Sequence, residues 1–352
     1  MNPPIDLKKL DKVFVIAEAG SNWKVGTYDQ DLKRAKEMIE VAAKAGVDAV
    51  KFQTFRPESV YVANAGKSHY LAESGIEQDI YQLFNQISMP YEMLKELAEW
   101  CEKNHILFMS SSFSVKDAQQ VDKYVHIHKV ASFEINHIRL LEYLANTKKP
   151  LIISTGASTY DEIDFAINLS QKNNCENIAL LQCTSKYPCS IESLNLSVIP
   201  KMVERYGLPV GLSDHSIDPI IAPLVAIGIG AKIIEKHFTL DKKLKGPDHA
   251  FALNPSELSQ MVSTIRRAEK ALGDGKKRIL DEETELRRFA TRSIQATRNI
   301  KKGEILVEGG NIDVLRPGNQ SRGIDARFLD KVVGKMAKRD ILLGEGILDN
   351  FE

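Results

Sequence analysis

Short apolar runs rich in Val, Ile and Phe alternate with longer segments of helical periodicity over most of the chain. The first run, residues 13–20 (VFVIAEAG), precedes a segment, residues 31–46 (DLKRAKEMIEVAAKAG), whose apolar positions recur every three or four residues before a glycine. A strand followed by an amphipathic helix is the repeating unit of α/β proteins. The pattern therefore predicts consecutive βα units.

Seven further apolar runs predict strands that begin near Ala49, Ile106, Val125, Pro150, Ile178, Pro209 and Ala231. No GxGxxG motif follows the first run, which argues against an open dinucleotide-binding sheet. Eight strands, most of them followed by a helical segment, instead favour a closed (β/α)8 TIM barrel over roughly residues 13–275.

The pattern changes near residues 280–290. A charged helical segment, residues 274–293, is followed by short apolar stretches separated by turn-forming residues, as in KKGE and LLGEG. The sequence therefore predicts an α/β protein with a TIM-barrel domain, residues 1–283, and a small β-rich domain, residues 284–352.

Composition and charge exclude several classes of protein and partner. The chain has 352 residues, of which 43% are hydrophobic and 27% are charged, as in globular proteins. Its 47 Lys and Arg balance 47 Asp and Glu, so no net field attracts nucleic acid or an anionic membrane. The longest apolar stretch, residues 220–234, is too short to span a bilayer. The four cysteines form no CxxC pair and predict reduced thiols in the cytoplasm.

Nearly every predicted strand ends in polar residues, which in a barrel surround one pocket at the C-terminal face. His215 and His237 end the last two predicted strands, so both imidazoles are expected to reach one metal ion. Such a pair suits a divalent transition ion that acts as a Lewis acid on a carbonyl. The alternative is that each histidine is an ordinary hydrogen-bonded residue of the core or surface.

Lys51 and Lys129 lie among apolar strand residues, where an unpaired ammonium is strongly unfavourable. One interpretation is a site for a phosphate or carboxylate, because hydroxyl-bearing residues stand at the same strand ends. These residues are Ser132, Ser154, Thr155, Thr184, Ser185 and Ser213. The other interpretation is a set of salt bridges inside the barrel, to Glu18, Glu134 or Glu235.

Glu18, Glu134 and Asp248 are candidates for acid–base chemistry or for binding sugar hydroxyls. Their spacing alone does not assign these roles. Gly246 and Pro247 predict a turn that presents Asp248 to the pocket, and His249 is expected to be a surface-loop residue.

A series of short motifs runs through nearly the whole chain. In order they are IAEAGSN, AVKFQTF, HKVASFEI, IISTGAS, CTSKYP, VGLSDHS, IEKHFT and GPDHAFAL, then RRFATRS and LRPGN. Together they resemble the sialic acid synthase family, which includes N-acetylneuraminate synthases and the related legionaminic and pseudaminic acid synthases. The resemblance implies a TIM barrel joined to an antifreeze-like (SAF) domain.

The resemblance also implies a reaction. Phosphoenolpyruvate condenses with an N-acylated amino sugar, N-acetylmannosamine or a related one, to give a nonulosonic acid and phosphate. By this resemblance, phosphoenolpyruvate is held by Lys51, Ser111, Lys129, Ser132, Ser154, Ser185 and Ser213, and the sugar is faced by Gln53, Tyr187, Asp248 and Arg316. His215 and His237 would hold a divalent metal ion, manganese in the first place and magnesium or cobalt otherwise. Glu134 and Glu18 are the candidates for managing protons or the attacking water.

The same resemblance implies a domain-swapped homodimer in which Arg316 reaches the barrel of the partner subunit. Two other functions remain open at this point. One is a metal-dependent aldolase or another phosphoenolpyruvate-condensing synthase on the same barrel, since fold alone does not fix function. The other is a non-catalytic carbohydrate-binding protein, against which the intact lysines and histidines argue.

Overall fold

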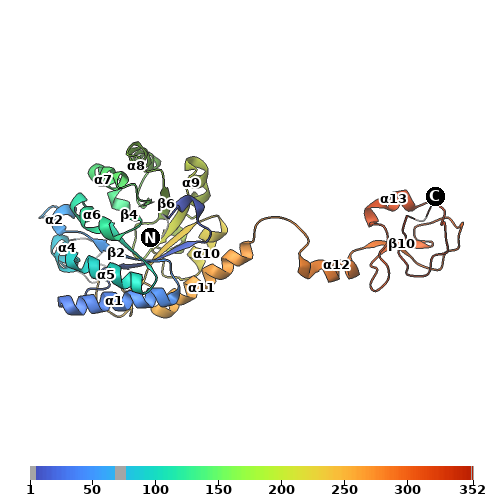
Figure 1. Ribbon diagram of the computed structural model, residues 1–352, viewed down its shortest axis with the longest axis horizontal. Coiled ribbons are helices and arrows are strands. Elements are labelled where there is room, and N and C mark those ends of the chain that lie inside the picture. Colours follow the sequence, from blue (N-terminus) through green and yellow to red (C-terminus); the bar gives the residue numbers. More distant parts are fainter. Residues whose placement is uncertain (1–4, 68–76, 350, 352) are drawn as a thin grey trace. The chain divides into compact units, whose positions relative to one another are not determined.

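The computed structural model describes residues 5–67, 77–349 and 351. The chain forms two compact units, Met1–Gly273 and Asp274–Glu352 (Figure 1). The boundary predicted between residues 283 and 284 falls inside the second unit, between the 3-10 turn η5 (Asp281–Glu283) and the short helix α12 (Thr284–Ala290).

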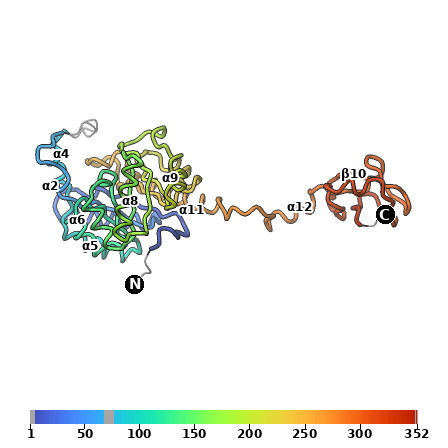
Figure 2. Tube along the Cα trace, turned by 90° about the horizontal axis from the view of Figure 1, so that it is seen from above, coloured from blue at the N-terminus to red at the C-terminus, as the bar shows by residue number. Residues whose placement is uncertain are grey.

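The first unit is a closed barrel of eight parallel strands in sequence order, which confirms the predicted fold (Figure 1). Figure 2 follows the backbone of the same unit as a tube. The strands are β1 (Phe14–Gly20), β2 (Ala49–Thr54), β3 (Leu107–Ser112), β4 (His128–Val130), β5 (Leu151–Ser154), β6 (Ile178–Cys183), β7 (Val210–Asp214) and β8 (Ile233–His237). The barrel closes where β8 pairs with β1, with Glu18 opposite His237. Strands that are distant in sequence therefore present their ends side by side.

Helices surround the barrel. They are α1 (Tyr28–Ala45), α2 (Pro57–Val60), α4 (Ile80–Ile87), α5 (Tyr91–Lys103), α6 (Val115–Val121), α7 (Ile138–Asn146), α8 (Tyr160–Lys172), α9 (Val198–Tyr206), α10 (Ile221–Gly228) and α11 (Pro255–Leu272). Helix α1 starts where the Gln30 side chain accepts the Thr27 N–H at 3.0 Å, and it ends at Gly46, whose φ of 83° suits glycine. These local signals define the first βα unit.

The strands bury apolar residues inside the barrel at one end and polar residues at the other. Inward positions alternate along a strand, so β8 points Ile233, Glu235 and then His237 inward. The lower part of the interior is filled by an apolar cluster of Leu7, Phe14, Ile16, Ala49, Met109, Ile127, Ile152, Ala179, Leu181 and Ile233. The side chains that point into the barrel thus change from apolar at the N-terminal end to mostly polar at the C-terminal face.

The second unit has a core of its own. Strands β9 (Ser293–Ala296) and β10 (Ile312–Leu315) pair antiparallel, and η6 (Ala326–Phe328) leads into α13 (Leu329–Val332). Its buried cluster comprises Ile294, Ala296, Ile300, Leu306, Ile312, Val332, Ala337, Ile341 and Ile347. A small β-containing domain of this kind was predicted from the tail.

Over the residues that the structure describes, no helix combines the length and the apolar character needed to cross a membrane.

The tight packing at β7 gives a direct test of the barrel. A Cβ on Gly211 would lie 2.3 Å from the carbonyl oxygen of Ile233, a backbone atom of the next strand. We expect Gly211→Ala to lower the free energy of unfolding by about 1–3 kcal/mol. Urea unfolding can be followed by fluorescence, because Trp23 and Trp100 both belong to the barrel unit.

Gly228→Ala is the matched control. Gly228 ends α10, and nothing lies within 4 Å of the added Cβ. Alanine is the better helix former, so this change should leave stability unchanged or raise it by up to about 1 kcal/mol. Equal effects of the two substitutions would contradict the close packing of β7 on β8.

Candidate active site

Lys51 of β2 is buried among carboxylates. Its Nζ lies 2.5 Å from Glu18 Oε2 on β1 and 3.7 Å from Glu235 Oε2 on β8, and it donates to Ser111 Oγ at 3.1 Å. Both Lys51 and Glu18 are almost fully buried. The ammonium is thus compensated, as the low-dielectric interior requires.

Lys129 of β4 makes a parallel set of contacts. Its Nζ donates to Ser154 Oγ at 2.7 Å and lies 3.8 Å from Glu235 Oε1, which also accepts the Ser213 hydroxyl at 3.0 Å. Glu235 therefore lies between the two lysines. The predicted salt bridges of the lysines inside the barrel are confirmed for Glu18 and Glu235.

A group of hydroxyls lies next to Lys129, around Gly156. The Gly156 N–H donates to Ser132 Oγ at 3.0 Å. A Cβ on Gly156 would lie 2.2 Å from Ser185 Oγ and 2.9 Å from both Ser132 Oγ and Cys183 Sγ. Glycine alone fits there, and the surrounding donors can bind an anionic oxygen. Ser185 Oγ, a buried atom, has no hydrogen-bond partner within the described residues.

His215 and His237 lie together at the ends of β7 and β8, with ring centroids 5.5 Å apart. His215 Nδ1 is 2.8 Å from the carbonyl oxygen of Thr184, which fixes that nitrogen as the donor and leaves Nε2 with its lone pair. His237 Nδ1 is buried without a hydrogen-bond partner in the described chain. Burial lowers the pKa of His237 well below its usual value, so this imidazole is neutral.

A neutral imidazole with a free nitrogen, such as that of His237, is a suitable ligand for a divalent transition ion. Against the effect of burial, Cys183 and the Thr184 carbonyl raise the pKa of His215, so a metal ion bound there would displace a proton from this ring at low pH. Across the described part of the chain, no cluster of three or more His, Cys, Asp or Glu is arranged to hold a metal by itself. A metal at His215 and His237 would therefore complete its coordination with water or substrate, as catalytic sites do. The residues present fit that group.

Three buried carboxyl groups have pKa values near neutrality. Burial raises the pKa of Glu18 to about 7, with Lys51 opposing the shift and Glu235 adding to it. Burial also raises the pKa of Glu134 to about 7, against the attraction of Lys129, and that of Asp248 to about 6. Groups that titrate in this range are suited to exchange protons near pH 7.

The other predicted residues of the barrel unit lie around the same centre. Gln53 donates to Glu18 Oε1 at 2.8 Å, the Tyr187 ring stacks on His215 at 4.1 Å between centroids, and Asp248 Oδ2 lies 3.7 Å from His237 Nδ1. Arg316 belongs to the second unit, where it is exposed directly after β10.

The expectation for His249 was wrong. Its side chain is buried, and its Nδ1 lies 2.7 Å from Thr239 Oγ1. The turn at Gly246 folds back so that His249 packs against the residues after β8, and a Cβ at Gly246 would meet its ring at 2.8 Å. The contact between His249 and Thr239, ten residues upstream, leaves no recognisable pattern in the local sequence.

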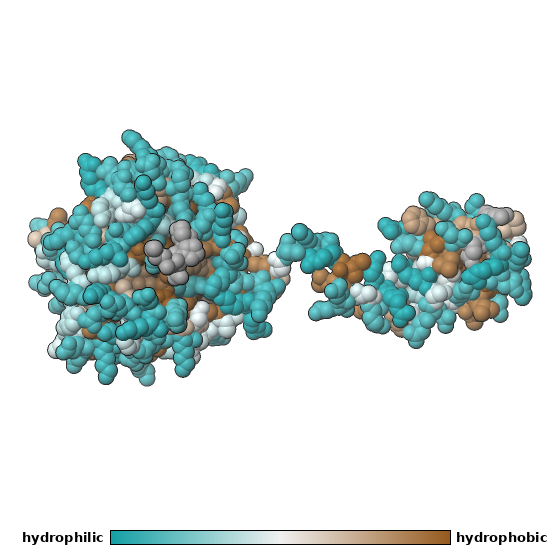
Figure 3. All heavy atoms as spheres, in the orientation of Figure 1, coloured by the Kyte–Doolittle hydropathy of each residue, from teal (hydrophilic) through white to brown (hydrophobic). Residues whose placement is uncertain are grey.

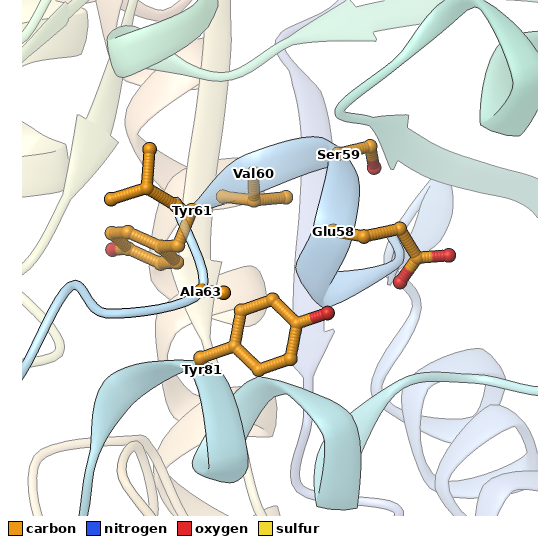
Figure 4. A pocket seen from close by; sticks show the side chains of 7 residues that line it. Glu58, Ser59, Val60, Tyr61, Ala63 and Tyr81 are labelled. Carbon is orange, nitrogen blue, oxygen red and sulfur yellow. The ribbon is translucent and has the colours of Figure 1, made fainter.

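A pocket of about 490 Å³ is lined by residues other than those of the titratable centre. It is lined by Glu58, Ser59, Val60, Tyr61, Val62, Ala63 and Tyr81, from α2, α4 and the segment that follows α2 (Figure 4). Burial raises the pKa of Tyr61, and the Glu134 carboxylate adds to the shift, which places this cavity near Glu134. No sequence motif pointed to it.

Two family models match the chain. Residues 38–277 match the model of the NeuB family, and residues 291–351 match that of the SAF domain. The chain belongs to the NeuB family.

Similar proteins cover nearly the whole chain. A pseudaminic acid synthase of Campylobacter jejuni is 37% identical over 96% of this chain and 96% of its own. A spore coat polysaccharide biosynthesis protein, SpsE, of Bacillus subtilis is 39% identical over 96% of this chain and 92% of its own. The crystal structure of an N-acetylneuraminic acid synthetase of Leptospira borgpetersenii, in complex with citrate, is 34% identical and superposes with a TM-score of 0.69 over 78% of this chain and 90% of that one.

The lysine cluster predicts a coupled effect on stability. Lys51→Met leaves Glu18 and Glu235 short of a cation and should lower the free energy of unfolding by about 3–5 kcal/mol. Adding Glu18→Gln removes one of these carboxylates, so the double variant should lose less than the sum of the single losses. Urea unfolding at pH 8 measures this above the Glu18 pKa of about 7 in the natural protein, where burial raises that pKa and Lys51 opposes the shift. Losses that add to within about 0.5 kcal/mol would contradict the ion pair.

Proposed function

We propose that this protein condenses phosphoenolpyruvate with an N-acylated amino sugar, N-acetylmannosamine or a related one, to give a nonulosonic acid and phosphate. The observation that carries the proposal is the pair of buried lysines, both of which contact Glu235. Glu235 lies one inward position below His237 on β8. The relatives named for pseudaminic acid and N-acetylneuraminic acid synthesis have similar sequence identities to this chain, 37% and 34%, which supports a nonulosonic acid as the class of product.

In this reaction C3 of phosphoenolpyruvate attacks the aldehyde carbon of the open-chain sugar, water adds to C2, and phosphate leaves. Lys51 and Lys129 supply charge for the carboxylate and phosphate, and the hydroxyls near Gly156 supply neutral donors. The ligand carries more negative charge than two lysines neutralise. Glu18 is half protonated near pH 7, which reduces the repulsion it would exert.

Glu134 is the candidate for accepting a proton from the water that adds to C2. It lies in the 3-10 turn η3 (Ser132–Glu134) that follows β4, and it is held in its buried site with a pKa of about 7. A carboxylate with that pKa accepts a proton at neutral pH and returns it readily. Gln53, Tyr187 and Asp248 are proposed to face the sugar.

We propose further that His215 and His237 hold a divalent metal ion, manganese in the first place and magnesium or cobalt otherwise. When bound, such an ion supplies Lewis acidity toward a carbonyl oxygen. The free Nε2 of His215 and the unpartnered Nδ1 of His237 support this assignment. The Thr184 carbonyl orients His215, and the Tyr187 ring covers it.

The proposed assembly is a domain-swapped homodimer in the cytoplasm, with Arg316 reaching the sugar bound in the partner subunit. Apolar side chains support it, since they gather on the segment that carries α12 (Figure 3). Leu280, Leu286 and Phe289 are 47%, 62% and 40% exposed there. Exposed apolar groups clustered in this way favour burial against another surface.

Phosphate release tests the reaction. Purified protein with manganese, phosphoenolpyruvate and one acceptor at a time should release phosphate, with N-acetylmannosamine, its 6-phosphate and a 2,4-diacetamido-6-deoxy hexose as the acceptors. Mass spectrometry should show one nonulosonic acid per phosphate. Lys129→Met should abolish release, whereas Lys149→Met, which alters a lysine paired with Asp122 before β5, should retain it. Absence of release with every acceptor would refute the proposal.

Metal removal tests the histidine assignment. Excess chelator should abolish turnover and manganese should restore it, since the proposed reaction needs an ion held by one nitrogen of each imidazole. His215→Ala should lower kcat by about 100-fold or more without unfolding the barrel. His126→Ala, at an exposed position, is the control. Full activity in chelator, or in the His215 variant, would exclude the proposed metal site.

Mixing two inactive variants tests the shared site. Arg316→Ala and His215→Ala, after verified subunit exchange, should form mixed dimers that each contain one complete site. Random pairing makes half the dimers mixed, so activity should recover to about a quarter of the natural level per total site. Without recovery, Arg316 cannot be acting in the partner's barrel.

A further inference from the structure

A buried ion pair lies next to both histidines and takes no part in the proposed reaction. Lys236 Nζ is 2.5 Å from Asp214 Oδ2 and 2.6 Å from the carbonyl oxygen of Ser216. All three residues are at most 2% exposed. Lys236 directly precedes His237, and its side chain leaves β8 on the face opposite to Glu235 and His237.

The ammonium of Lys236 fixes the backbone on both sides of His215. Asp214 precedes His215 and Ser216 follows it, and Asp214 Oδ1 also accepts the Ser216 N–H at 2.8 Å. From the other side, the His215 carbonyl accepts the Cys189 N–H at 3.1 Å. The Nδ1 contact with Thr184 then holds the ring, so that Nε2 is the ring nitrogen left for a ligand.

Stability alone does not account for this pair. Taking a lysine and an aspartate out of water costs several kcal/mol each, and apolar residues of similar size often serve stability as well. Instead, the contact between Lys236 on β8 and Ser216 after β7 fixes the distance between the ends of these two strands. It ties the strand that ends in His237 to the turn that carries His215, whose rings lie 5.5 Å apart.

We propose that Lys236, through Asp214 and Ser216, is a positioning residue that fixes the spacing of the His215 and His237 imidazoles for a shared divalent ion. This inference rests on the metal site of the proposed function. Partners that orient a metal ligand without touching the metal typically contribute 10–100-fold to metal affinity. The loss of the Lys236 contacts should therefore weaken metal binding by about that factor.

The test measures Mn²⁺ affinity of the full-length protein by calorimetry and by the electron paramagnetic resonance signal of free Mn²⁺. Lys236→Met should lower the affinity about 10–100-fold. The double variant Asp214→Asn/Lys236→Met should do the same, and it folds more readily because it removes both charges while Asn keeps an oxygen for the Ser216 N–H.

Lys149→Met is the matched control. Lys149 also binds an aspartate side chain, Asp122 at 2.8 Å, together with the carbonyl of that residue, but it lies before β5 at the opposite end of the barrel. It should change Mn²⁺ affinity by less than about twofold, whatever its effect on urea unfolding. Circular dichroism and urea unfolding establish which variants fold.

Several outcomes would overturn the inference. One is an Mn²⁺ affinity within about threefold of the natural protein in a folded Lys236 variant, and another is an equal loss of affinity in Lys149→Met. A third is unfolding of both Lys236 variants, which would make the ion pair a requirement for folding. A natural protein that binds no Mn²⁺ would also overturn it. If Mn²⁺ binds and the variants lose it, but no acceptor gives phosphate release, the proposed reaction fails and the positioning role stands.

Discussion

Two ammonium groups inside a closed barrel are the constraint on which the rest of the site depends. Lys51 and Lys129 cannot be left uncompensated in a dry interior, and they share Glu235 while Glu18 and hydroxyls complete their contacts. Burial raises the pKa of Glu18 to about 7, whereas, against the effect of burial, the two lysines lower the pKa of Glu235. At Glu18, charge compensation and proton exchange near neutral pH thus have one physical origin.

The fold was predictable because its main signal is local. Each strand has its own apolar run, and the alternation of inward positions turns a run such as Ile233, Glu235 and His237 into one apolar and two polar levels of the barrel. The same alternation places Lys51 and Gln53 on one side of β2. Knowledge of the strands therefore largely determines which side chains meet inside.

What the sequence did not disclose depends on contacts between distant segments. The run from Val125 predicted a long fourth strand, but β4 covers only His128–Val130 and the rest turns into η3, so Glu134 stands on a turn rather than on a strand. His249 is buried by Thr239, and the cavity at Tyr61 needs α2 and α4 together. In the proposed dimer, the placement of Arg316 would depend on a second chain, which the sequence of one chain does not define.

The apolar cluster inside the barrel fills its N-terminal end, so the site opens at the C-terminal face. Leu7 sits in the 3-10 turn η1 (Leu7–Lys9), held by the Asn177 side chain that accepts its N–H at 2.9 Å, and it joins the cluster that closes that end. In the proposed reaction, ligands would enter and leave past His237 and Gln53, which lie one inward position above Glu235 and Lys51. A molecule held at the lysines would then be enclosed while another occupies the upper level, so the proposed sites imply an order of arrival: the deeper ligand first, the outer ligand second.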